Sequence, residues 1–177
     1  MKVYFSTNSA DLWVVSGSCT ECNATTTFNA SASSTFQVDQ DPTTPPAPAS
    51  IDGDPVNGSL VYDVVSLSQD NPPHNQSWIL VDQTGFSGLS GFASGTIGLG
   101  FNTSDDTKTT PFWKSFFASR QIPPEMGFWL SRNYVGEPIG YLLLGGRDES
   151  YYAGDPEFHS VITEDDLTEW RISISGT

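Results

Sequence analysis

The stretch Phe5-Ser6-Thr7-Asn8-Ser9-Ala10-Asp11-Leu12-Trp13-Val14 joins two short apolar runs, residues 2–5 and 12–15. Runs of this length and composition are typical of strands, and the small polar residues between them are typical of a loop. The hydroxyls of Thr7 and Ser9 can hydrogen-bond the backbone of such a loop, and Asn8 tolerates a positive φ better than most residues. We therefore predict a strand, a tight polar loop and a second strand.

The same pattern continues along the chain, since further apolar or alternating runs are each bounded by Gly, Pro, Asn, Asp or Ser. The fold is therefore predicted to be mainly β. The runs are residues 60–67, 78–81, 127–130, 141–144, 158–162 and 170–174.

One helix is predicted to begin at Thr110-Pro111 and to end before Ile122-Pro123-Pro124. Thr110 can cap the helix and Pro111 suits its first position. Aromatic side chains recur on one face of this helix, which indicates core packing rather than a cofactor site. They are Phe112, Trp113, Phe116 and Phe117.

Two segments before the middle of the chain have turn or edge character. Four prolines in residues 41–50 remove ladder donors and predict an exposed extended segment or an irregular edge. Residues 51–59, with Asp52-Gly53-Asp54, are typical of a hairpin tip.

Length and charge limit the function. At 177 residues the chain has room for one domain, and a net charge of −14 repels nucleic acid and anionic lipid surfaces. Because of this charge we expect no nucleic-acid partner and no association with anionic membranes. The apolar runs are also far shorter than the ~20 residues of a membrane-spanning helix.

Glycosylation motifs point to the secretory pathway. With 8 Asn and 40 Ser plus Thr, chance gives about two Asn-x-Ser/Thr triplets of the kind that carries N-linked sugar. The chain has five, and we predict a secreted glycoprotein, although residues 1–5 do not form a signal peptide. The predicted sites are Asn23, Asn29, Asn57, Asn75 and Asn102.

Cys19 and Cys22 are the two cysteines of the chain. Their spacing suits a redox motif, half a zinc site or a local disulfide. A zinc site is disfavoured because no second pair exists and His74 and His159 lie far apart. The loop-like surroundings and the secretory motifs favour a small structural disulfide.

The sequence offers no recognisable catalytic machinery. A Gly-x-Ser-x-Gly elbow and a phosphate-binding loop are both absent, and nothing indicates a cofactor or a metal. The acidic clusters 105–106 and 164–166 are interpreted as solvated loops. A glycan-acting hydrolase needs a closely spaced pair of carboxylates, and the candidates for such a pair are Asp52, Asp54 and Asp82.

The order of motifs resembles the N-terminal lobe of pepsin-like aspartic proteases over nearly the whole chain. Residues 5–14 are similar to the family's active-site strand and loop, hydrophobic-Asp-Thr-Gly-Ser followed by Leu-Trp-Val. Similar segments follow in the family's order: Cys19 and Cys22 (first disulfide loop), 28–36, 57–65 (second strand of the flap hairpin), 94–100, 110–113 and 143–154. The resemblance implies one pepsin-like lobe over residues 1–177, a six-stranded-type β barrel or sandwich with one or two short helices.

The departures from the family pattern bear on activity. Two family aspartates, one from each lobe, share a proton and activate water. The resemblance places Ser6 at the first of these positions, and a hydroxyl cannot act as that general base. Thr7 is retained, whereas Asn8 replaces the motif glycine. We therefore expect no catalytic residue for peptide hydrolysis in this chain.

Further residues are assigned by the resemblance to the cleft and the flap. Ile51 replaces the flap tyrosine and Ala93-Ser94 replaces a bulkier residue followed by Asp, so the pocket wall is expected to be smaller. The full set is Trp13, Ile51, Asp52, Gly53, Ala93 and Ser94.

The resemblance covers one lobe without its first hairpin and without a second lobe. Exposed strand edges are then expected, which invite a second lobe or a partner chain. A symmetric dimer would place Ser6 opposite Ser6 and would not restore the aspartate pair. Three hypotheses follow: a secreted lobe without peptidase activity that binds protein or polysaccharide, a fragment of a two-lobed aspartic endopeptidase, or the glycan-acting hydrolase.

Overall fold

The computed structural model describes residues 1–19, 22–24, 26–41, 47–51, 54–69, 71–84, 93–102, 107–130, 140–162 and 169–174. Of residues 47–51, 54, 55 and 84 it describes the backbone alone. All structural statements below concern these residues.

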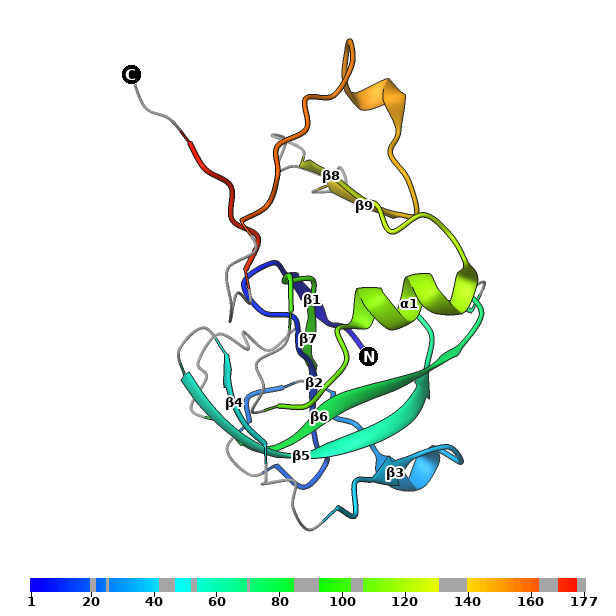
Figure 1. Cartoon of the computed structure of the whole chain (residues 1–177). Helices are drawn as coiled ribbons and strands as arrows, with labels where there is room; N and C mark the ends of the chain where they lie inside the picture. Colours follow the sequence, from blue (N-terminus) through cyan, green and yellow to red (C-terminus); the bar gives the residue numbers. More distant parts are fainter. Residues whose placement is uncertain are drawn as a thin grey trace.

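The chain is mainly β, as predicted (Figure 1). Seven strands form one sheet in the order β1-β7-β2-β6-β5-β3, with β4 also paired to β5. Their bounds are β1 Tyr4–Ser6, β2 Leu12–Val15, β3 Gln37–Val38, β4 Ala47–Ile51, β5 Asp54–Val65, β6 His74–Thr84 and β7 Gly95–Gly98. Two short 3-10 helices, Ala30–Ala32 and Glu149–Tyr151, accompany them.

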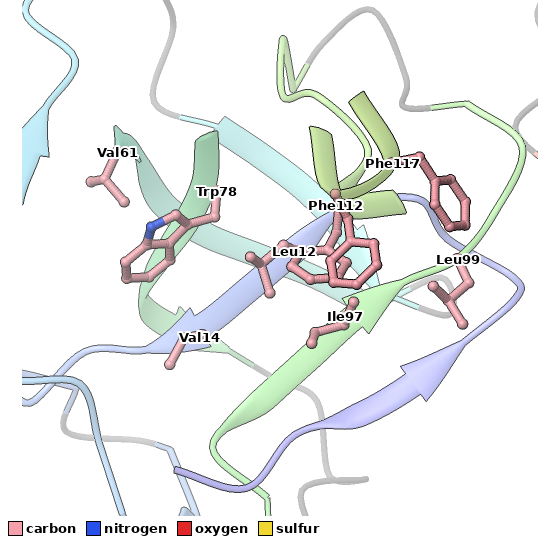
Figure 2. Packing of buried hydrophobic residues seen from close by; sticks show 9 residues of the cluster. Leu12, Val14, Val61, Trp78, Ile97, Leu99, Phe112 and Phe117 are labelled. Carbon is pink, nitrogen blue, oxygen red and sulfur yellow. The ribbon is translucent and has the colours of Figure 1, made fainter. Parts of the chain in front are cut away.

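Strand β2 lies at the centre of the sheet and is buried on both faces. Trp13 and Val15 pack into one cluster with Val56, Ile79 and Val81. Because side chains alternate across a strand, Leu12 and Val14 enter a second cluster on the opposite face. Figure 2 shows this second cluster, in which Val61, Trp78, Ile97 and aromatic residues of the helix surround the two β2 side chains.

Helix α1, Phe112–Arg120, covers the second cluster with Phe112, Phe116 and Phe117, so the predicted aromatic face is confirmed as core. The predicted cap is shifted by one residue, because Pro111 and not Thr110 is the N-cap. The backbone of Thr110 is instead bound to β6: its N–H donates to Ser77 Oγ, and its carbonyl accepts from the Gln76 amide. The helix ends at Gln121, which adopts the left-handed conformation with φ 54°.

The predicted hairpin around residues 51–59 is formed by β4 and β5, paired from Ile51↔Asp54 to Ala47↔Gly58. Residues 52–53, which join the two strands, lie outside the described residues. Within residues 41–50 the structure places Pro48 on β4, whose described partner is β5 alone, as expected for a proline-containing edge.

A separate two-stranded hairpin consists of β8, Met126–Leu130, and β9, Gly140–Leu144. Figure 1 shows it beyond α1, away from the seven-stranded sheet. The runs 158–162 and 170–174 were predicted as strands, but their described residues form only the single bridge Val161↔Ile172. That prediction is wrong because alternation alone does not supply a sheet neighbour.

Candidate active-site loop

The loop between β1 and β2 crosses the end of β7. Strand β1 runs parallel to β7, and β2 runs antiparallel along the other side of β7. Three backbone hydrogen bonds fix the loop: Leu99 N to Ser6 O at 2.6 Å, Gly100 N to Ser9 O at 2.8 Å and Gly98 N to Asp11 O at 2.9 Å. The predicted strand, loop and strand are therefore confirmed, with β7 as the element that holds them.

Gly98 makes this close crossing feasible. A Cβ atom at position 98 would lie 2.3 Å from the carbonyl carbon of Ala10 and 2.5 Å from the nitrogen of Asp11. Both contacts are far inside van der Waals distance and both are with backbone, which cannot move aside without moving the loop. The glycine thus sets how closely the loop packs on β7.

Asp11 holds the loop to a distant segment through a buried carboxylate that is 7% exposed. The hydroxyls of Thr107 (2.9 Å) and Thr109 both donate to Asp11 Oδ1. Burial raises the pKa of Asp11 above its ordinary value, and the hydrogen bonds from Thr109 and Thr107 partly offset that rise. Sequence reasoning gave Asp11 no role, because partners almost 100 residues away leave no local signal.

Two indole groups support the backbone that follows β7. Trp170 Nε1 donates to Leu99 O at 2.6 Å, and Trp113 Nε1 donates to Gly100 O at 2.8 Å. The two rings also lie 6.0 Å apart, centroid to centroid. Leu99 therefore accepts from Trp170 while its own N–H donates to Ser6, so the far end of the chain supports the loop.

Ser6 and Asn8 lie at the solvent side of this loop. Ser6 is half-buried, and its Oγ accepts a long hydrogen bond of 3.3 Å from Asn8 N. Asn8 is exposed, and its φ is not among the positive values of the described non-glycine residues, which are those of Lys108 and Gln121. Asparagine thus occupies the position without left-handed strain.

The cysteine pair forms a disulfide, as predicted, between Cys19 and Cys22. Both cysteines pack against the cluster that contains Trp13 and Ala93, which are buried. Ser94 is buried as well, and its hydroxyl shares a 2.6 Å hydrogen bond with Thr26. These residues are core in the described structure, and their assignment to a cleft stays a prediction.

Of the remaining candidate carboxylates, the structure describes the side chain of Asp82 alone. Asp82 is exposed on β6 and accepts from Ser18 at 3.1 Å. Asp52 and Gly53 lie outside the described residues, and the side chains of Ile51 and Asp54 are not described. Within the described ranges no group of three His, Cys, Asp or Glu side chains could hold a metal ion.

The two histidines occupy different surroundings. His74 is buried against Phe112 and Phe116 of α1, and burial, followed by the Arg120 charge, lowers its pKa. His159 is exposed and lies 3.3 Å from the Glu157 carboxylate. Neither histidine has a hydrogen bond with Ser6 among the described residues, so the described part of the chain shows no base paired with the Ser6 hydroxyl.

Two of the hollows among the described residues lie away from this loop. One, of about 520 Å³, is lined mainly by apolar side chains, among them Val3, Val14, Leu67 and Trp78. Its lining includes Met1 and Val3, which precede β1, and the described partner of β1 is β7 alone. The other, of about 440 Å³, lies on the β8–β9 hairpin and is rich in aromatic residues.

The full chain, residues 1–177, matches the family model of eukaryotic aspartyl proteases. The chain belongs to this family. It is 31% identical to major aspartyl peptidase 1 of Cryptococcus neoformans var. grubii, over 98% of this chain and 36% of that protein. It is 33% identical to pregnancy-associated glycoprotein 1 of Sus scrofa, over 99% of this chain and 46% of that protein. It is 31% identical to cathepsin D of Gallus gallus, over 86% of this chain and 39% of that protein. The chain thus spans less than half the length of these relatives.

Membership of the aspartyl protease family agrees with the resemblance to one lobe, in which residues 5–14 are similar to the family's active-site strand and loop. The described loop is held by backbone hydrogen bonds to the end of β7 and the residues after it, and the position that the resemblance equates with the family's aspartate carries the Ser6 hydroxyl. Among the described helices none is long and apolar enough to span a membrane.

Proposed function

We propose that this chain, by itself, is an aspartyl protease lobe without peptidase activity that is secreted and binds protein or polysaccharide. The observation that carries the proposal is Ser6 at the end of β1. A hydroxyl cannot hold the charge or accept the proton that the family's water activation requires. The acid nearest in sequence, Asp11, is buried and engaged with Thr107 and Thr109, which argues against its replacing the missing group.

The aromatic hollow supports a binding role. Trp129, Tyr141 and Tyr151 lie with ring centroids 4.9–5.9 Å apart and planes within 30° of one another. Tyr141 is 50% exposed and Tyr151 44%, with Arg147 and Asp148 on the same wall. Rings with an apolar face and a polar edge suit the apolar faces of sugars and of peptide side chains.

A second candidate function is that of one lobe in a two-lobed protein. The hairpin carries exposed apolar side chains on both faces, since Phe128 and Leu130 alternate with Trp129, which pairs with Tyr141. A two-stranded sheet that is apolar on both sides suits an inner layer covered by further polypeptide.

The deciding experiment is proteolysis of an unfolded protein substrate by the purified chain from pH 2.5 to 7, with and without pepstatin. Circular dichroism establishes that the sample is folded, and a two-lobed family member serves as the positive control. We expect no cleavage by the chain or by its Ser6→Ala variant. Pepstatin-sensitive cleavage by the unmodified chain would refute the proposal.

The binding role is tested separately by titrating the chain with soluble polysaccharides and with a denatured protein while tryptophan fluorescence is followed. Tyr151→Ala is the matched variant, because it removes one ring of the hollow and leaves the β8–β9 pairing intact. We expect saturable binding of one ligand class, weakened in the variant. Binding of neither ligand would count against the binding module and favour the two-lobed reading.

A further inference from the structure

Asn75 differs in its surroundings from three of the other predicted glycosylation sites, Asn29, Asn57 and Asn102, whereas Asn23 is exposed without a hydrogen bond among the described residues, as Asn75 is. The Asn57 amide donates to Gln83 Oε1 at 3.4 Å, and Asn29 Oδ1 accepts from the Ser31 backbone at 3.1 Å. Asn102 Oδ1 accepts from Lys114 Nζ at 3.2 Å. Asn75 is exposed, and its side chain makes no hydrogen bond within the described part of the chain.

The sheet places Asn75 beside an exposed apolar surface. Asn75 on β6 pairs with Val64 on β5, so the two side chains share a face, and Tyr62 lies two residues along β5 on that same face. Tyr62 is 42% exposed and Val64 39%. Two apolar side chains thus face solvent within one diagonal step of Asn75.

A hollow of about 250 Å³ lies at this place. It is lined by a hydroxyl, two amides, a carboxylate and an aromatic ring, and the hydroxyl of Thr35 donates to the carboxylate of Asp63. The lining residues are Thr35, Gln37, Tyr62, Asp63 and Asn75. A sugar ring has the matching chemistry, with hydroxyl and acetamido groups at its rim and an apolar C–H face.

We propose that Asn75 carries an N-linked glycan whose first N-acetylglucosamine lies in this hollow against the Tyr62 ring. The glycan then covers apolar surface of β5 that the protein leaves exposed. The inference rests on the secretory route proposed above and is independent of whether the lobe cleaves peptides.

The modification is a transfer from a lipid-linked oligosaccharide pyrophosphate. The bond between sugar C1 and the pyrophosphate oxygen breaks, the bond from C1 to Asn75 Nδ2 forms, and Nδ2 loses one proton while the lipid pyrophosphate leaves. The hydroxyl of Ser77, the third residue of the motif, is buried and accepts from Thr110 N at 2.8 Å in the folded chain. The transfer therefore precedes the packing of β6 against the start of α1.

The test uses the full chain produced in a yeast secretory host, with every glycan trimmed to one N-acetylglucosamine. Glycopeptide mass spectrometry measures occupancy, and thermal unfolding is compared for Asn75→Gln in the Tyr62 and Tyr62→Ala backgrounds. We expect Asn75 to be occupied, and Asn75→Gln to lower Tm by about 2–4 °C with Tyr62 present and not with Tyr62→Ala.

Two controls separate the sugar from the side chain. Asn75→Gln in chain made without glycosylation is expected to leave Tm unchanged, and the effect of Asn29→Gln is expected not to depend on Tyr62. An unoccupied Asn75 would overturn the proposal. An equal loss of Tm in both Tyr62 backgrounds would also overturn it, because the sugar would then stabilise without contact with the ring.

Discussion

Replacing Asp11 tests what holds the candidate active-site loop in place. Asp11→Ala removes the acceptor of two buried hydroxyls, those of Thr107 and Thr109. A buried donor that loses its acceptor costs about 1–3 kcal/mol, so the expected loss of unfolding free energy is at most about 6 kcal/mol, and the two hydroxyls still lie 3.4 Å apart in the unmodified chain. A loss of that size is a large part of the ~5–15 kcal/mol that a domain of this size usually has.

Asp11→Asn is the matched variant, because its amide oxygen can still accept from both threonines while the charge is removed. We expect it to be much less destabilising than Asp11→Ala. Since burial raises the folded-state pKa of Asp11, the native chain holds the proton to higher pH than the unfolded chain does. The Asp11 contribution to stability is therefore present below its ordinary pKa and is lost as pH rises through the raised value.

The measurement is urea unfolding of the unmodified chain and of Asp11→Asn at several pH values from 3 to 7, followed by tryptophan fluorescence. The two chains share all other titrating groups, so the difference in their unfolding free energies isolates Asp11. As pH rises, we expect the unfolding free energy of the unmodified chain to fall relative to that of Asp11→Asn, by at most about 1.4 kcal/mol per pH unit. A difference that stays constant, or moves the other way, would refute this account of the buried carboxylate.

Three further predictions concern other contacts. Trp170→Phe keeps the ring but removes the N–H that donates to Leu99 O, and calorimetry should record a loss of about 1–3 kcal/mol. Gly98→Ala forces the loop off β7 and should cost about 1–3 kcal/mol or more in urea unfolding, whereas Gly146→Ala, where a Cβ meets nothing within 4 Å, should cost little. Burial lowers the folded-state pKa of His74, so the contribution of His74 to folding stability is present above its ordinary pKa and is lost as pH falls. His74→Phe should therefore flatten the decline in Tm below about pH 6.5.

The hydrophobic patterns predicted the elements whose side chains contact the core directly. Strand β2 has the predicted bounds, and the aromatic face of α1 enters the cluster around Leu12 and Val14. Strand β7 was not among the predicted strands, because Gly95-Thr96-Ile97-Gly98 lacks an apolar run. It lies between β1 and β2, and its two glycines allow close approach of β2 and of the loop before β2, which a count of apolar residues does not detect.

At the candidate site, too, features that depend on neighbouring residues were predicted, and contacts between residues far apart in the sequence were not. The polar loop at residues 6–11 was predicted from its own residues, and the Cys19–Cys22 bond from its spacing and surroundings. The hydrogen bonds from Thr107 and Thr109 to Asp11, and from Trp170 to Leu99, were not predicted. These partners become neighbours only when the sheet has formed, so a single sequence carries no pattern for them.

The contacts that fix the loop are also independent of the side chain of Ser6. The interactions that fix it are backbone hydrogen bonds to β7, the buried Asp11 carboxylate and the Trp170 indole, and none of them uses the side chain of Ser6. The Ser6 side chain accepts one weak hydrogen bond from its own loop, so a change at this position costs the fold little. The interactions that stabilise the loop and the side chain at the position that the resemblance equates with the family's aspartate therefore involve different atoms.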